Sequence, residues 1–164
     1  MKRLLLLAAM GLMACGGHDT ETLVYDGHEL EPKSILFARV PVEGNAFTVA
    51  VISDRGDACT QFDGLGCVPQ PHLGTSLVFR TPVFSKGTLT IGSELSASWL
   101  DFQGVRVLAG AASSGQLGVD QAEDEEEFGG TFDLTLPEGQ LEGAFTADFC
   151  EPMREYYLSC ANSQ

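Results

Sequence analysis

Apolar and polar residues alternate through two adjacent segments near the end of the chain. From residue 131 to 136, every second residue is Phe or Leu and the others are Thr or Asp. From 141 to 149, small or apolar residues again occupy every second position, and Pro137-Glu138-Gly139 separates the two segments. Successive side chains of a strand point to opposite faces. The pattern therefore predicts a half-buried β-hairpin.

The rest of the chain has the same short, turn-bounded segments and no 11-residue window with a helical apolar stripe. It predicts an all-β fold, an antiparallel β-sandwich or jelly-roll-like domain of about eight or nine short strands. Residues 153–158 allow a single helical turn, and residues 54–73 form a long irregular stretch. The other expected strands are Leu23–Tyr25, Ser34–Val40, Ala46–Ser53, Thr75–Thr81, Gly87–Gly92, Leu95–Leu100, Val105–Ala109 and Gln116–Asp120.

The first residues read as an export signal. Met1-Lys2-Arg3 is basic and precedes an apolar run, Leu4–Met13, of ten residues. A bilayer-spanning helix needs roughly 20. The run ends in Leu12-Met13-Ala14-Cys15, which resembles the lipobox of bacterial lipoproteins, in which the Cys is acylated. The alternatives are an ordinary secretory signal cut elsewhere and an uncleaved anchor.

The lipobox and the strand pattern together predict three parts of the chain. Residues 1–14 are a lipoprotein signal peptide, 15–22 are the lipidated N-terminus and a polar tether, and 23–164 are a single β-sandwich-like domain. Two or more acyl chains give stable attachment to a membrane. The expected membrane contact is thus a covalent lipid on Cys15.

The chain is strongly acidic, with a formal net charge of −14. Loss of the signal removes Lys2 and Arg3, which leaves seven basic against 23 acidic residues and a net charge of −16. Nucleic acids and anionic lipid headgroups are polyanions that such a domain repels. Nucleic-acid binding is therefore excluded as a function.

Five cysteines are an odd number for an exported protein. If Cys15 carries the lipid, Cys59, Cys67, Cys150 and Cys160 are an even set in an oxidising compartment. Three pairings are possible, and the short intervening segments favour Cys59–Cys67 with Cys150–Cys160. The rival, a zinc site, lacks a CxxC pair and a nearby His.

The order of several short motifs resembles uncharacterised small predicted lipoproteins of myxobacteria and related deltaproteobacteria. The resemblance implies an envelope location and a β fold, and it implies no activity. It also leaves open a pairing of Cys150 with Cys59. The motifs that carry it are the lipobox, Ile52-Ser53-Asp54 before Cys59, Ala112-Ser113-Ser114-Gly115, Gly130-Thr131-Phe132-Asp133-Leu134, Leu141-Glu142-Gly143-Ala144-Phe145 and Asp148-Phe149-Cys150.

The acidic run at residues 120–127 is a candidate for a weak calcium site. Calcium takes six to eight converging oxygens, usually at defined spacing. Asp120, Glu123, Asp124 and Glu126 supply carboxylates without that spacing. The simpler interpretation is a solvated acidic loop.

The sequence predicts no catalytic residue. Residues 110–115 do not fit a Gly-x-Ser-x-Gly elbow. His18, His28 and His72 lie in the tether, a turn-rich segment and the irregular stretch, as solvated histidines would. Trp99 is expected in the core, with a sugar-stacking platform as the alternative.

The leading hypothesis is a non-catalytic binding or structural β-domain, lipid-anchored in a bacterial envelope, with an envelope protein or glycan as its partner. Gly16 after the lipidated Cys favours the outer membrane by analogy with bacteria that sort lipoproteins by that residue. The alternatives are an envelope hydrolase and an acidic protein that binds divalent cations. No cofactor is expected beyond the lipid and the weak calcium site.

Overall fold

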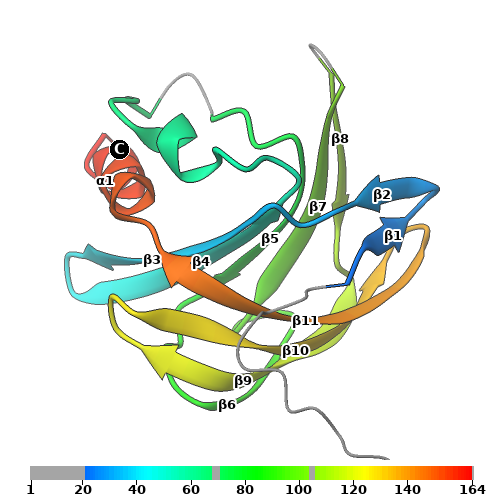
Figure 1. The fold of residues 1–164 in the computed structure, drawn as a ribbon. Helices are drawn as coiled ribbons and strands as arrows, with labels where there is room; N and C mark the ends of the chain where they lie inside the picture. Colours follow the sequence, from blue (N-terminus) through cyan, green and yellow to red (C-terminus); the bar gives the residue numbers. More distant parts are fainter. Residues whose placement is uncertain (1–20, 68–70, 104–105, 164) are drawn as a thin grey trace, which may run out of the picture.

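A computed structural model describes residues 21–67, 71–103 and 106–163 (Figure 1). The signal peptide and Cys15 lie outside the described residues. Strands β1 and β2 pair as a small two-stranded sheet, and the other strands form a nine-stranded sheet. The elements are β1 (Leu23–Tyr25), β2 (His28–Leu30), β3 (Ser34–Val42), β4 (Asn45–Ser53), η1 (Cys59–Phe62), β5 (Thr75–Thr81), β6 (Gly87–Thr90), β7 (Ser96–Gln103), β8 (Arg106–Ala111), β9 (Ser114–Glu123), β10 (Glu127–Leu136), β11 (Gly139–Phe149) and α1 (Glu151–Ala161).

The expected all-β class is confirmed. The large sheet has the order β6-β9-β10-β11-β3-β4-β5-β7-β8 and curls strongly (Figure 1). Neighbouring strands are antiparallel except for a short parallel contact between β11 and β3. Hydrogen bonding runs unbroken from β6 to β8, so one curled mixed sheet provides the facing layers that a sandwich builds from two sheets.

The C-terminal hairpin is confirmed as β10 and β11. Leu134 lies opposite Leu141, and Leu136 lies opposite Gly139. Phe132, Leu134 and Leu136 are buried, whereas Thr131 and Asp133 are exposed. The alternation in the sequence therefore matches the two faces of this part of the sheet.

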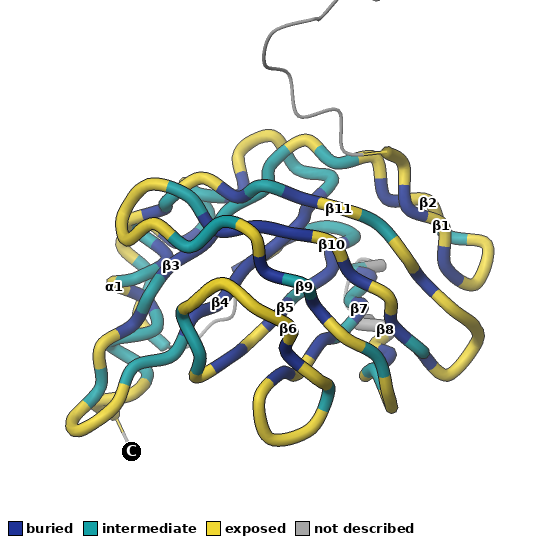
Figure 2. The backbone as a smooth tube through the Cα atoms, turned by 90° about the horizontal axis from the view of Figure 1, so that it is seen from below, coloured by how far each residue is buried: buried dark blue, intermediate teal, exposed yellow. Residues whose placement is uncertain are grey.

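Two apolar cores lie on opposite faces of β3, β4 and β5. The larger core fills the concave side of the curled sheet, and its aromatic centre includes Phe79, stacked on Phe145 with ring centroids 5.1 Å apart. The smaller core lies between the convex side, η1 and α1, and includes Val51, Phe62 and Met153. β4 is consequently buried on both faces along most of its length, which Figure 2 shows as continuous dark blue.

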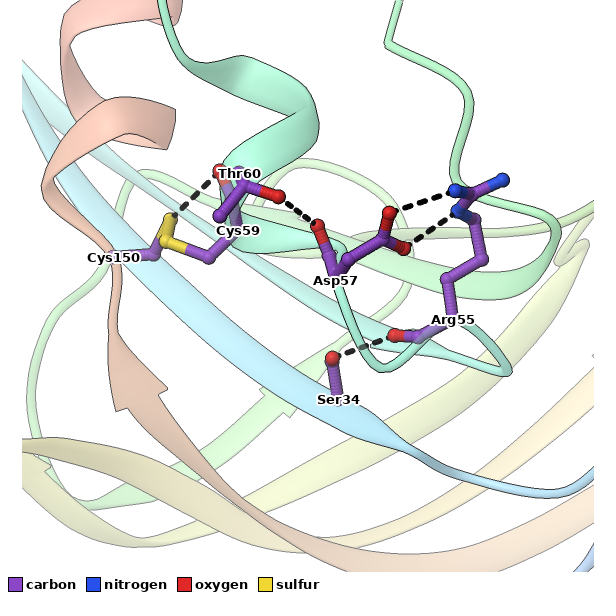
Figure 3. The surroundings of a disulfide bond; sticks show 6 residues. All are labelled: Ser34, Arg55, Asp57, Cys59, Thr60 and Cys150. Atoms are coloured by element: carbon purple, nitrogen blue, oxygen red, sulfur yellow. Dashed lines mark hydrogen bonds and ion pairs between the residues drawn. A yellow bond between two sulfur atoms is a disulfide. The ribbon is translucent and has the colours of Figure 1, made fainter.

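The disulfides differ from the expected local pairs. One joins Cys59 to Cys150 across 91 residues (Figure 3). The other joins Cys67 to Cys160 across 93 residues. The predicted Cys59–Cys67 and Cys150–Cys160 pairs are thus wrong. Both bonds fasten the irregular stretch to the segment that follows β11, because that segment packs on the same convex face. The number of residues between two cysteines does not show which cysteines lie close together in the fold.

The C-terminal segment is also longer than the single turn that the sequence suggested. α1 spans 11 residues with Pro152 in its first turn, where the missing N–H of proline costs no hydrogen bond. The backbone N–H of Cys150 donates to the carbonyl of Phe37 on β3. Met153 and Tyr156 are buried beneath the helix. Packing against β3 and the disulfides therefore stabilises a helix whose apolar face is narrow.

The irregular stretch is ordered by polar contacts at its start. Arg55 donates to both carboxylate oxygens of Asp57, at 2.9 and 2.8 Å (Figure 3). This hydrogen-bonded guanidinium lowers the pKa of Asp57. The hydroxyl of Ser34 donates to the carbonyl of Arg55 at 2.6 Å. These contacts hold the chain where it leaves β4 and turns toward η1.

Candidate functional site

A small cleft lies where the β1–β2 hairpin meets the large sheet. The hairpin approaches β7 and β8 on one side and the β10–β11 turn on the other. The volume of the cleft is about 180 Å³. Its described lining consists of Tyr25, Asp26, His28, Trp99, Asp101, Ala109, Gly110, Pro137 and Glu138.

A His–Asp pair forms one wall of the cleft. His28 Nδ1 lies 3.0 Å from Asp101 Oδ2, and Asp101 is only 6% exposed. The hydroxyl of Thr75, opposite Asp101 in the β5–β7 register, lies 3.3 Å from the other carboxylate oxygen. In a neutral imidazole this contact places the hydrogen on Nδ1 and leaves Nε2 as an acceptor. The carboxylate therefore orients the ring.

Two aromatic rings form a second wall. Tyr25 and Trp99 have ring centroids 5.4 Å apart at an angle of 53°. The Tyr25 hydroxyl accepts the backbone N–H of Glu138 at 3.0 Å, which leaves its own hydrogen to donate elsewhere. Trp99 is only 2% exposed, so the expectation of a core residue is confirmed and an open sugar-stacking platform is wrong.

Gly110 lines the cleft and has no side chain that would fill it. A Cβ at this position would lie 3.1 Å from Tyr25 Oη and 3.5 Å from Pro137 Cδ. Glycine thus lets Tyr25 lie close against β8. This packing joins the hairpin to the sheet and sets the depth of the cleft.

The chemistry of the lining is that of an acceptor-rich site. Three of its residues are carboxylic acids, and His28 supplies a ring nitrogen. Among the described lining residues none is Lys or Arg, and none is Ser, Thr or Cys. The cleft therefore holds an oriented base without a serine, threonine or cysteine among its described lining residues. Such a lining suits the binding of a hydrogen-bond donor.

The predicted calcium ligands do not converge. Asp124 Oδ2 is 2.9 Å from Arg39 Nη1, while Asp120, Glu123 and Glu126 are exposed. The neighbouring Glu125 pairs with Arg154. In the described part of the chain, no three His, Cys, Asp or Glu residues are grouped so that they would hold a metal ion.

Arg154 connects α1 to the acidic run. Its guanidinium donates to Glu151 and to Glu125, and these hydrogen bonds raise the pKa of Arg154. The guanidinium also lies over the ring of Phe149, 5.1 Å from the centroid. The acidic run is thus partly neutralised by arginines from α1 and β3.

The cleft has no signature in the sequence. The sequence predicts that His28 is a solvated histidine in a turn-rich segment, and it gives no role to Asp101. His72 lies away from the cleft, exposed beside Phe102 with ring centroids 5.1 Å apart. The segment 110–115, which does not fit a nucleophile elbow, spans the end of β8, the connection at residues 112 and 113 and the start of β9. No spacing in the sequence indicates the His28–Asp101 pair, because the two residues meet through the docking of one sheet on another.

Comparisons of the chain with models of protein families, with curated proteins and with solved structures return no match. Among the residues that the structure describes, no helix has the length and apolar character needed to cross a membrane.

Proposed function

We propose that this protein is a bacterial envelope lipoprotein, anchored through Cys15, whose β-domain binds an envelope partner without catalysing a reaction. Its proposed location is the outer membrane. Its partner is an envelope protein or an envelope glycan.

The cysteine pairing carries the anchoring part of this proposal. Cys59, Cys67, Cys150 and Cys160 pair with one another, and Cys15 is the remaining cysteine of the five. A thiol at the end of an export signal is then available for acylation. Two disulfides also suit an oxidising compartment. Strand β1 begins at Leu23, so few residues separate the proposed lipid from the domain.

Replacing Cys15 by Ser tests the anchor. In cells fed a labelled fatty acid, we expect the parent protein to carry the label and to sediment with membranes, because the acyl chains bury apolar surface in the bilayer. C15S should lose both properties. A Cys67→Ser/Cys160→Ser variant serves as a control that removes cysteines and keeps the anchor. Persistent labelling of C15S would refute lipidation at this residue.

An envelope hydrolase is the second candidate, and the His28–Asp101 pair favours it. A carboxylate-oriented imidazole is a general base in many hydrolases. The described lining offers no serine, threonine or cysteine beside it, which favours binding over catalysis. Assays with a panel of aryl esters separate the two. Turnover by the parent protein that falls at least about a hundredfold in His28→Ala, a typical general-base contribution, would establish the hydrolase instead.

A further inference from the structure

We propose that the cleft beside the β1–β2 hairpin binds a cationic amine or guanidinium group. The cation is either a free amine or a basic side chain of a polypeptide. This inference rests on the proposed binding role of the domain and names the chemical class of its ligand.

The arrangement of acceptors supports a cation. Asp26 and Glu138 are exposed residues of the rim, and the Asp101–His28 pair lies deeper. An ammonium group donates three hydrogen bonds and a guanidinium donates five, and neither accepts any. Opposite charges attract strongly where the walls are apolar and water is partly excluded. The lining thus matches the hydrogen-bonding pattern and the charge of such a group.

The aromatic and apolar lining supports the part of the ligand behind its charge. Tyr25 and Trp99 line the same cleft as the carboxylates, and both rings are largely buried, at 8% and 2% exposed, so they act as apolar walls and not as open platforms for a cation. Ala109 and Pro137 complete an apolar surface against which the methylene groups of a lysine or arginine side chain would pack.

The size of the cleft limits the ligand to a head group. Its volume of about 180 Å³ is smaller than the pockets of about 300–1,000 Å³ that enclose drug-sized ligands. One amine or one side chain therefore enters, and the rest of the ligand stays outside. An anionic ligand is disfavoured, because no described lining residue is Lys or Arg and the whole chain carries a net charge of −14.

Trp99 provides a direct readout, because it is the single tryptophan of the chain and lies in the cleft wall. The experiment titrates the full mature protein, in neutral detergent, and follows tryptophan fluorescence. The probes are n-butylamine as a free amine and N-acetyl-lysine N-methylamide as a peptide-borne amine. N-acetyl-norleucine N-methylamide is the neutral control of similar length.

We expect a saturable fluorescence change with a cationic probe and none with the norleucine compound. Stronger binding of butylamine identifies a free amine as the ligand, and stronger binding of the lysine compound identifies a basic side chain. Both outcomes support the site. An equal response to the norleucine compound, or no saturable response to either cation at tens of millimolar, would overturn it.

Charge-neutral variants of the rim test the geometry. Asp26→Asn/Glu138→Gln should weaken cation binding at least about tenfold, because it removes two carboxylates from the cleft. Asn keeps the left-handed backbone of position 26, where φ is 50°. The matched control, Asp120→Asn/Glu123→Gln, neutralises two exposed carboxylates of β9 outside the cleft and should bind normally. Unchanged affinity in the rim variant would refute the assignment.

Filling the cleft gives an independent test. Gly110→Val places a side chain where a Cβ already approaches Tyr25 Oη, and it should abolish the fluorescence response. A folded Gly110→Val protein, judged by circular dichroism, that still binds the cation would also refute the site. Failure of these tests would exclude the cleft as the ligand site and would leave the lipid anchor, which the labelling of Cys15 tests separately. Loss of lipid labelling alone would leave the cleft unaffected.

Discussion

Gly115 lies where a side chain has no room. It occupies the start of β9 with φ at 129°, a backbone conformation that L-residues rarely adopt. An added Cβ would lie 2.3 Å from the carbonyl oxygen of Asp133 on β10. The close approach of two backbones at this point therefore depends on one missing carbon atom.

We expect Gly115→Ala to reduce the free energy of unfolding by more than about 2 kcal/mol, because it combines backbone strain with a clash against a neighbouring strand. Urea denaturation followed by circular dichroism measures the change. Gly56→Ala is the matched control, since a Cβ there meets no atom within 4 Å. Equal unfolding free energies of the two variants would show that β9 and β10 move apart to admit the Cβ without a loss of stability.

The cleft residues also show how little a single position reveals in isolation. His28 and Asp101 are unremarkable in the sequence, and each acquires its chemistry from the other at 3.0 Å. The same holds for Tyr25, whose hydroxyl meets the backbone of Glu138. The sequence gives the identity of each of these side chains, but their roles depend on neighbours that are distant in sequence.

Among the elements, the strands were the easiest to predict. β1 and β5 have the bounds that their patterns indicated, and the β10–β11 hairpin has the expected faces. Alternation is a local property, so burial of one face is visible in the sequence. β2 was missed because three residues are too few to show a period. α1 was underestimated because tertiary contacts stabilise it.

A tyrosine of helix α1, Tyr157, predicts how the stability of the protein changes at alkaline pH. Tyr157 packs against Phe47, Phe62 and Tyr156. Burial, and then the charge of Tyr156, raise the pKa of Tyr157 from 10.0 to about 12, against a smaller opposing effect of Arg80. The unfolded chain therefore ionises this phenol first as the pH rises. The contribution of Tyr157 to stability is complete below pH 10 and is lost between pH 10 and about 12.

We expect the melting temperature of the parent protein to fall from about pH 9 to about pH 11.5, and to fall less steeply in Tyr157→Phe, which has no proton to lose. Differential scanning calorimetry at matched ionic strength measures both slopes. Tyr25→Phe is a control phenol on the opposite side of the sheet. Parallel slopes for the parent and Tyr157→Phe would show that the folded state ionises this group freely.

The molecule as a whole is held by contacts between its middle and its end. Each disulfide closes a loop of more than 90 residues, from the irregular stretch to the helix after the last strand. Constraining such a loop in the unfolded chain contributes roughly 4–5 kcal/mol in the chain-entropy model. The two bonds therefore stabilise the domain more than the local pairs, Cys59–Cys67 and Cys150–Cys160, would have done.

Peptide mapping checks this connectivity. Cleavage at Asp63, Arg80 and Arg154 without reduction separates the four cysteines of the domain into different peptides. We expect Cys59 joined to Cys150 and Cys67 joined to Cys160. The Cys67→Ser/Cys160→Ser variant should lose about 3 kcal/mol of unfolding free energy in urea, because with Cys59–Cys150 intact the second bond closes a loop of only about 20 residues. A peptide that joins Cys59 to Cys67 would contradict the structure.

The sequence by itself established the features that depend on neighbouring residues. These are the all-β class, the positions of most strands, the faces of the C-terminal hairpin and the strong acidity of the chain. The lipidation of Cys15 is a prediction of the same local kind, read from the lipobox, and it awaits its labelling test.

The arrangement in space settled what depends on residues far apart along the chain. The curl of the large sheet, the two disulfide pairs, the docking of α1 and the cleft around His28 and Asp101 all arise from packing. The physical reason is that burial, hydrogen bonding and disulfide formation require proximity, and no local pattern encodes proximity across 70 or 90 residues. The lipobox-like motif is local and predicts an anchor, while the cleft between two sheets depends on packing and provides the candidate chemistry.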